Sequence, residues 1–496
     1  MASDAATIDL CIISHTNAGK TTLARTLLGR EIGEVRDQPH VTEIAESHVL
    51  LETPQGDVLR LWDTPGFGDS VRLVKRLMLS DNPIGWMLRE VWDRFRDRPF
   101  WCSQQAMRAA RESTDVVLYL ANAAEDPRDA TYVTAEMQIL RWIDKPVLLL
   151  LNQVGPPKPA AQEHAEEERW RSHVAPLAVV REVLTLDAFA RCWVQEGVLL
   201  RAVAKVLPEE QREPFARLSA AWTARNVVRF DAAMAILAEQ IARTARDREP
   251  LAPAAPRGVA QQVLKSFGIG KRSRDATRDR AIDALAERLD RETRDATQRL
   301  IGLHGLEGNA TAMVLQRVRE HLADTGRIGE GRAAALGGIV SGALSGLAAD
   351  LAAGGLTLGA GMLAGGILGA LGGVGIARSY NIIRGRDQAA IGWGAPSLDA
   401  LAAAAIVRYL AVAHFGRGRG RYVEGEAPAF WRNEATRAIA DHSATLHALW
   451  ENAAPSEDPE QVQHDLQNTL ASATAEVFER LYPGRVSAAL AESRAE

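Results

Sequence analysis

Hydrophobic residues in the first 208 positions come in short continuous runs separated by polar loops. Continuous apolar runs are typical of parallel strands covered on both faces, and the segments between them have the length and spacing of helices. The predicted strands lie at residues 8–13, 47–51, 57–62, 116–120, 147–151 and 179–186. We therefore expect residues 1–208 to form an α/β domain with a mostly parallel sheet.

An insertion rich in arginine, tryptophan and methionine interrupts this alternation at residues 70–114. Its apolar residues recur at roughly helical spacing, so we expect helices there. The aromatic side chains either pack inward or form a ligand-responsive surface for a partner, and the pattern leaves both open.

Beyond Pro208 the chain becomes rich in alanine, leucine, arginine and glutamate, and strand patterns vanish. Amphipathic periodicity predicts long helices at 209–249 and 275–320. We expect an all-α C-terminal part. Its predicted divisions are 209–332, 333–378 and 379–496.

Residues 333–377 carry no charge except Asp350. Glycine recurs there at every fourth position, which places the glycines on one helical face where two backbones approach closely. We therefore predict a glycine-zipper hydrophobic hairpin, which either enters a membrane or packs inside a soluble helical core. Arginines flank both ends, so both ends would stay on the cytoplasmic side of a membrane.

Composition excludes several classes of protein. The net charge of -5 and the pI near 6.2 argue against a general nucleic-acid binder, which needs a basic face. Three cysteines without metal-ligand spacing indicate a reduced compartment. The N-terminus lacks the pattern of an export signal, so we expect a cytoplasmic protein, either peripheral to the inner membrane or inserted through the hairpin.

The turn after the first predicted strand has the chemistry of a phosphate cradle. Gly19 lets the backbone approach a phosphate, Lys20 reaches the β and γ oxygens, and the Thr21 hydroxyl ligates Mg²⁺. Ser14 stands where the motif usually has its first glycine. The residues expected around the phosphates are Ser14, Asn17, Ala18, Gly19, Lys20, Thr21 and Thr22.

An Asp-Thr-Pro-Gly sequence follows the third predicted strand. Asp63 is placed to hold the Mg²⁺ shell, and the Gly66 N–H to contact a γ-phosphate. Thr42, in the loop before the second strand, is either a further Mg²⁺ ligand that senses this phosphate or a simple turn residue. Phe67 cannot orient an attacking water, so we expect hydrolysis to be slow or dependent on a partner.

These motifs, in this order, resemble the translation-factor class of GTPases, and Asn17-Ala18-Gly19-Lys20 is similar to their Era/TrmE branch. The resemblance implies binding of GTP or GDP with Mg²⁺ and hydrolysis at the β/γ phosphoanhydride, with Lys20, Thr42 and Asn17 as catalytic residues. In that branch the asparagine at this position helps to bind K⁺. Asn17 is therefore either a K⁺ ligand or a turn residue.

The family's fourth motif, Asn-Lys-x-Asp, is altered here. Asn152 ends the fifth predicted strand, but Gln153 replaces the lysine, and Gly155 replaces the aspartate that reads guanine. Loss of that carboxylate predicts relaxed base selectivity. Asp187 is either a substitute carboxylate or the N-cap of the following helix.

The combination of Asn152-Gln153-Val154-Gly155 with residues 188–196 resembles a bacterial group in which a GTPase domain is fused to a C-terminal domain of unknown function 3482. This resemblance implies no biological role. Loss of the γ-phosphate would release the loops at Thr42 and Gly66 and change how the helical part docks, so we expect a nucleotide-dependent switch acting on the helical part. Membrane lipid, a membrane protein, another protein or a second copy in a homodimer remain open as partners. The alternatives are a non-catalytic or base-promiscuous nucleotide-binding scaffold and a ribosome-associated assembly GTPase, although no basic RNA-binding appendage is visible.

Overall fold

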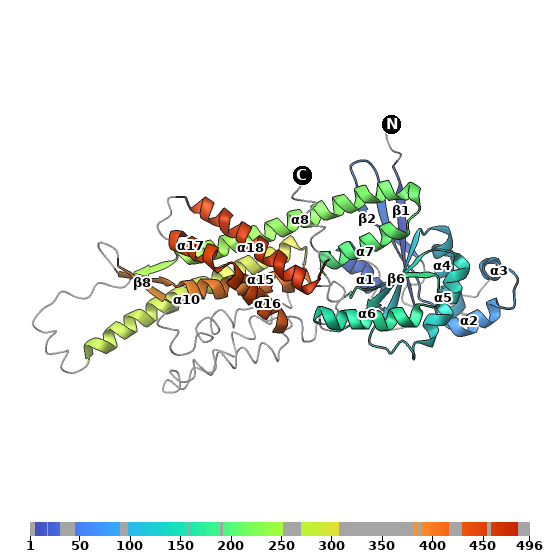
Figure 1. Cartoon of the computed structure of the whole chain (residues 1–496), viewed down its shortest axis with the longest axis horizontal. Coiled ribbons are helices and arrows are strands. Elements are labelled where there is room, and N and C mark those ends of the chain that lie inside the picture. Colours follow the sequence, from blue (N-terminus) through green and yellow to red (C-terminus); the bar gives the residue numbers. More distant parts are fainter. Residues whose placement is uncertain are drawn as a thin grey trace, which may run out of the picture. The chain divides into compact units, whose positions relative to one another are not determined.

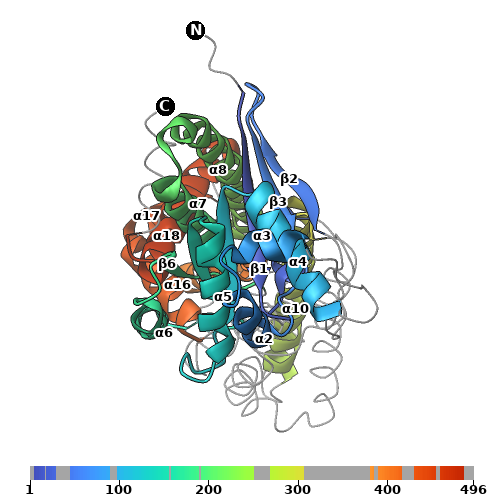
Figure 2. The ribbon, with the colours of Figure 1, turned by 90° about the vertical axis from the view of Figure 1, so that its right-hand side faces the viewer.

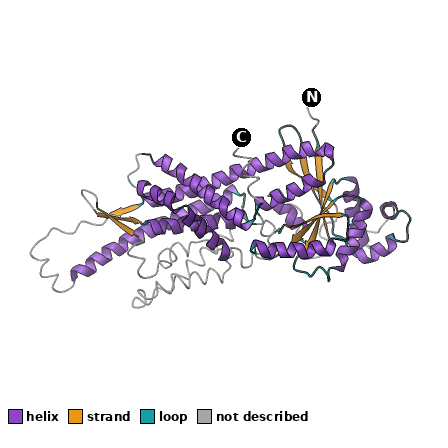
Figure 3. Cartoon of the chain, in the orientation of Figure 1, coloured by secondary structure: helices purple, strands orange, loops and turns teal. Residues whose placement is uncertain are grey.

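The computed structural model divides into two compact units. The first comprises Met1–Val228, Ala413–Tyr422 and Leu481–Glu496, and the second comprises Arg229–Val412 and Val423–Arg480. A large sheet lies in the first unit, and helices dominate the second (Figure 1; Figure 3). The structure describes residues 5–16, 18–29, 45–89, 98–155, 158–188, 192–250, 269–306, 380–384, 389–415, 429–453 and 458–484.

The first unit is built on a six-stranded sheet in the order β2-β3-β1-β4-β5-β6. Every neighbouring pair is parallel except β2 and β3, which form an antiparallel hairpin. All six predicted strands are confirmed within a residue or two. Their bounds are Thr7–Ser14 (β1), Glu46–Glu52 (β2), Val58–Asp63 (β3), Val116–Asn122 (β4), Val147–Asn152 (β5) and Val180–Thr185 (β6).

The central strands β1, β4 and β5 are buried along nearly their whole length, because helices cover both faces of the sheet (Figure 2). The predicted insertion forms three helices, and Phe100 packs inward from the last of them. The helices of this unit are Lys20–Leu28 (α1), Ser70–Leu77 (α2), Pro83–Arg89 (α3), Arg98–Glu112 (α4), Thr131–Ile143 (α5), Ala160–Val174 (α6) and Trp193–Val206 (α7).

One long helix, α8 (Glu209–Arg246), contains the division between the two units, which falls after Val228. The remaining helices belong mainly to the second unit. They are Ile269–Leu303 (α10), Ala395–Ala413 (α15), Ala429–Asp441 (α16), Ser443–Ala453 (α17) and Pro459–Leu481 (α18).

The expectation that strands are absent beyond Pro208 needs a correction. The second unit is mostly helical, but it contains a small antiparallel sheet in the order β7-β9-β8. These strands have three to five residues, which is too short for a period-2 pattern to stand out. Their bounds are Arg248–Pro250 (β7), Tyr380–Arg384 (β8) and Ala389–Trp393 (β9).

The core of the second unit is aromatic. Tyr409 on α15 contacts Phe230 on α8 and Phe478 on α18, with ring centroids 5.6 and 6.0 Å apart. Among the described residues, α15 is the one helix long and apolar enough to cross a membrane, but most of it is buried within the protein as in a core helix. The predicted hairpin at 333–377 lies outside the described residues.

Candidate functional site

The predicted phosphate loop connects β1, which ends at Ser14, to α1, which begins at Lys20. Gly19 has a φ of 89°, in the left-handed region that favours glycine. A Cβ at this position would lie 2.7 Å from Nδ2 of Asn152, so a side chain is excluded sterically as well. No side chain caps the start of α1, which leaves a helix N-terminus suited to an anion.

Asn152, at the end of β5, braces this loop. Its Nδ2 donates to the carbonyl oxygen of Ala18 at 2.7 Å, and its Oδ1 accepts the backbone N–H of Ala188 at 2.8 Å. The side chain is fully buried. The asparagine therefore joins the phosphate loop to the loop after β6.

Lys20 lies buried beneath the loop, where Nζ donates to Oγ of Ser14 at 3.0 Å. Burial lowers the pKa of Lys20, while the nearby carboxylates of Asp63 and Glu136 oppose that shift. The hydroxyl of Ser14 thus serves as an acceptor for the lysine at a position where a glycine has no side chain.

Asp63 ends β3 directly beside α1. The Thr21 Oγ1 donates to Asp63 Oδ2 at 2.7 Å, whereas Asp63 Oδ1 is buried and has no hydrogen-bond partner among the described residues. Burial raises the pKa of Asp63, and the Thr21 hydrogen bond and the Lys20 charge oppose the rise. A buried carboxylate oxygen without a donor, next to a threonine hydroxyl, fits the oxygen ligands that Mg²⁺ prefers.

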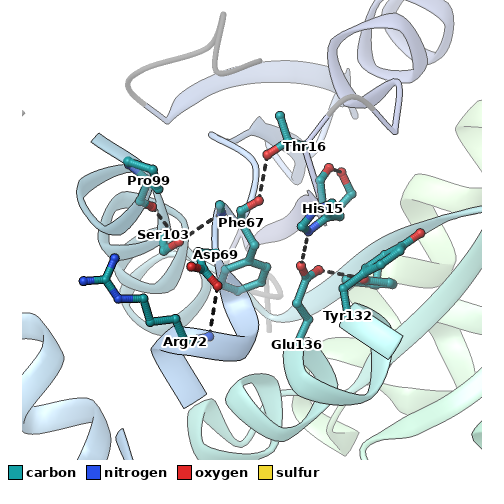
Figure 4. A network of polar contacts seen from close by, with 12 residues as sticks. His15, Thr16, Phe67, Asp69, Arg72, Pro99, Ser103, Tyr132 and Glu136 are labelled. Atoms are coloured by element: carbon teal, nitrogen blue, oxygen red, sulfur yellow. Dashed lines mark hydrogen bonds and ion pairs between the residues drawn. The ribbon is translucent and has the colours of Figure 1, made fainter. Parts of the chain in front are cut away.

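The loop after Asp63 lies against the phosphate loop. The Phe67 N–H donates to the Ser14 carbonyl at 2.9 Å, and the Thr16 hydroxyl donates to the Phe67 carbonyl at 2.8 Å (Figure 4). A Cβ on Gly66 would lie 2.9 Å from Lys20 Nζ. Gly66 is therefore close to the lysine, while the Phe67 ring is buried in the hydrophobic core.

The backbone conformation of the altered fourth motif explains why a glycine occupies position 155. Gly155 has a φ of 81°, and Gln153 also has a positive φ of 60°. Asp187 is buried, and its Oδ2 accepts the backbone N–H of Val154 at 2.8 Å, so this carboxylate lies at the same loop. Helix α7 begins at Trp193 with Cys192 at its N-cap position, so the N-cap interpretation of Asp187 was wrong.

A buried network beside the phosphate loop was missed by the sequence analysis. Glu136 on α5 is fully buried, and His15 Nδ1 lies 2.7 Å from its Oε1 (Figure 4). The Tyr119 hydroxyl donates to Oε2 of Glu136 at 2.6 Å. The His15 ring stacks on Tyr132 at a centroid distance of 4.4 Å. Nothing in the sequence pairs His15 with a glutamate 121 positions away.

The structure thus brings most of the predicted site residues together at the carboxyl end of the sheet. Thr22 is buried in the first turn of α1, and the amide of Gln153 faces the Gly19 backbone. Asn17 and Thr42 lie outside the described residues. Of the three predicted Mg²⁺ ligands, Thr21 and Asp63 can be located, and they are in hydrogen-bond contact. Within the described parts of the chain, no group of three or more His, Cys, Asp or Glu side chains is placed to hold a metal.

Two family models match the chain. Residues 177–472, more than half of the sequence, match the model described as "Domain of unknown function (DUF3482)", and residues 9–153 match "50S ribosome-binding GTPase". The second match supports GTP binding and hydrolysis as the activity of the first unit. No functionally curated protein matched the sequence.

Solved structures with some similarity include two of Era. One is Era in complex with MgGDPNP and a segment of 16S ribosomal RNA, with 18% identity and a TM-score of 0.30. The other is an Era variant from Aquifex aeolicus bound to GDP and aluminium fluoride, with 18% identity and a TM-score of 0.31. Each similarity covers 41% of this chain and 57% of that one.

A variant of SsGBP has 15% identity and a TM-score of 0.23, over 43% of this chain and 56% of that one. The chain therefore spans less than two thirds of each solved structure, and likenesses this low do not extend to function. The family models are the informative matches. The chain belongs to the family Domain of unknown function (DUF3482), and its N-terminal residues 9–153 match the model of a GTPase domain.

Proposed function

We propose that the chain is a guanine-nucleotide hydrolase that acts as a switch on its helical unit. The observation that carries the proposal is the buried Oδ1 of Asp63, which has no donor although Thr21 and Lys20 lie next to it. Leaving such an oxygen unsatisfied costs about 1–3 kcal/mol, which a bound cation would offset. A second support is the start of α1 at Lys20, where no side chain caps the helix.

Each residue of the site would have a separate role in binding the nucleotide. Lys20 and the N–H groups at the start of α1 would bind the phosphates, and Thr21 and Asp63 would hold Mg²⁺ directly or through water. The ion would neutralise charge that develops on the phosphate oxygens. Gly66, close to Lys20, would report the terminal phosphate, because loss of that group removes the partner of its N–H.

Phe67 lies where Ras-like GTPases have the glutamine that orients the attacking water, and a phenyl ring cannot make that hydrogen bond. Hydrolysis would therefore be slow or would need a further group. We propose K⁺ held by Asn17 as that group, because a cation near the β/γ bridge would offset the charge formed there. The test is phosphate release from GTP with Mg²⁺ in K⁺ buffer and in Na⁺ buffer. Faster release in K⁺ is expected, and absence of release in both would favour a non-catalytic scaffold.

Asp187 is proposed to replace the missing base-reading carboxylate, because it is buried and bound to the N–H of Val154 in the altered motif. The wild type would then bind GTP more tightly than ATP or XTP. Asp187→Asn should lower the preference for GTP over XTP about tenfold or more, while Asn keeps the oxygen that accepts from Val154. The exposed Asp144→Asn is the matched control. Equal preference in wild type and Asp187→Asn would remove Asp187 from base recognition.

The route from the nucleotide to the helical unit is proposed to be α8. Within the first unit, Arg217 on α8 binds Asp57 at the foot of the β2–β3 hairpin, with N···O distances of 2.7 and 2.8 Å. Gln211 binds Asp115 at 2.9 Å. Because β3 carries Asp63 at its other end, movement of that strand would reach α8 through Arg217.

A further inference from the structure

The helix that follows the predicted γ-phosphate loop exposes apolar side chains. On α2 and the turn after it, Val71, Met78 and Leu79 are 44, 59 and 89% exposed. The same helix buries Leu73 and Val74. The exposed residues therefore lie outside the hydrophobic core that Leu73 and Val74 enter.

The backbone that presents these residues is ordered by hydrogen bonds. Asp69 caps α2 by accepting the Arg72 N–H at 3.0 Å. At the other end, the N–H groups of Met78 and Leu79 donate to the carbonyls of Val74 and Arg76 at 2.9 and 3.1 Å. The exposed Leu79 side chain therefore projects from a backbone that hydrogen bonds hold in place.

Cations share this face. Arg72 and Lys75 are exposed, and neither forms an ion pair with any other described residue. The guanidinium of Arg72 lies 5.1 Å from the centre of the Phe100 ring, which holds it beside the helix. The neighbouring acids are Asp69, engaged in the cap, and Asp81 beyond the turn.

The size and shape of the patch favour one class of partner. Stable protein interfaces bury about 800 Å² on each side, far more than three protruding side chains supply. Binding to a bilayer needs less, because each inserted apolar side chain contributes through its own buried area and each cation near an anionic surface adds an electrostatic attraction. The patch thus has the chemistry of an interfacial lipid contact.

We propose that Val71, Met78 and Leu79, together with Arg72 and Lys75, form a contact site for an anionic lipid surface. The site begins five residues after Gly66, so its presentation would depend on the bound nucleotide. Only this dependence rests on the proposed function. Lipid contact itself requires no nucleotide.

A local probe tests the contact directly. Leu79→Cys carrying an environment-sensitive fluorophore should shift its emission to the blue with vesicles that contain phosphatidylglycerol, and not with pure phosphatidylcholine vesicles. Val228→Cys is the matched control, because Val228 is also apolar and is 69% exposed. The three native cysteines are buried, so labelling is directed to the introduced thiol. No shift at position 79, or an equal shift at both positions, would overturn the proposal and leave a protein partner as the occupant.

Vesicle flotation adds the energetic test. Met78→Ser combined with Leu79→Ser should lower partition onto phosphatidylglycerol vesicles about tenfold or more, whereas Val228→Ser should not change it. Unchanged partition of the double variant would contradict a lipid contact by α2. Nucleotide affinity measured on the same samples separates the proposals: a wild type that passes the lipid tests but binds no GTP would disprove the proposed function and leave the lipid site standing.

Discussion

The six-stranded sheet has a buried aspartate at each end, and the two carboxylates differ in their hydrogen-bond donors. At the carboxyl end, Asp63 keeps one oxygen without a donor, and burial raises its pKa. At the amino end, Asp57 accepts hydrogen bonds from Arg217, from the Thr53 hydroxyl and from the Ala6 N–H. These donors, Arg217 first, lower the pKa of Asp57 to about 2.

This difference separates a carboxylate that can bind a ligand, Asp63, from a structural clamp, the ion pair of Asp57 with Arg217. A carboxylate whose donors all come from the chain gains nothing from a ligand, whereas one left unsatisfied in a dry site is stabilised when a cation arrives. Both aspartates are buried, so burial alone would not distinguish them. Variants at the two ends should accordingly fail in different assays.

The largest effect is expected for Lys20→Ala at the carboxyl end. Loss of the buried ammonium should weaken GTP binding about 100-fold or more, because a charge-assisted contact to phosphate disappears. The melting temperature without nucleotide should not fall, since the lysine is buried at a cost to its charge. Titration with a fluorescent GTP analogue measures the affinity. Lys205→Ala, on an exposed lysine, is the control, and equal affinities would place the nucleotide elsewhere.

Asp63→Asn should abolish the gain in GTP affinity on adding Mg²⁺, a change of about tenfold or more. The pKa of Asp63 is raised because burial disfavours its charge, so ionisation costs the fold stability and the neutral Asn should keep or raise the melting temperature without Mg²⁺. That difference should vanish as the pH falls below the usual value of 3.8, where the unfolded chain also becomes protonated. Calorimetry with and without Mg²⁺ checks both points, and a strongly destabilised variant would show that Asp63 is structural.

Asp57→Asn, at the amino end, should lower the melting temperature by about 5 °C and leave nucleotide affinity nearly intact. The pKa of Asp57 is below its usual 3.8, so its contribution is complete above that pH and is lost as the pH falls toward 2. Urea unfolding at pH 7 and pH 3 should show a smaller difference at pH 3. Glu213→Gln is the control, because Glu213 also contacts Arg217 but is exposed. An equal loss from both variants would refute the clamp.

Smaller effects should come from the network around Glu136, where Glu136→Gln is the first variant to test. Glutamine replaces two contacts to a charged carboxylate, from His15 and Tyr119, with contacts to a neutral amide, so about 1 kcal/mol of stability should be lost. GTP affinity should fall only a few-fold, because the phosphate loop loses a brace and no ligand contact. Tyr119→Phe removes one donor alone and should cost less. A loss of affinity as large as that of Lys20→Ala would instead assign Glu136 to the nucleotide site.

Local patterns predicted the sheet and the phosphate loop because both depend on neighbouring residues. The apolar runs of β1, β4 and β5 read directly as buried strands, and Gly19, Lys20 and Thr21 are adjacent. Asp63 could be added because the carboxyl ends of parallel strands meet at one edge.

Contacts between distant positions could not be predicted in this way. Arg217 looks like any surface arginine of an amphipathic helix until it meets Asp57, 160 positions earlier. The pairing of His15 with Glu136 is hidden for the same reason. Asp187 followed by a helical pattern suits an N-cap, and only the start of α7 at Trp193 decides against it.

The contacts made by the first turns of α8 determine which N-terminal fragments of the chain should be stable. A fragment ending at residue 208, where the sequence pattern changes, would retain Asp57 and Asp115 but remove Arg217 and Gln211. A buried carboxylate would then lose its strongest partner, and the excised domain should aggregate or be cleaved by proteases. A fragment extended to Val228 keeps both contacts and is the one expected to survive on its own.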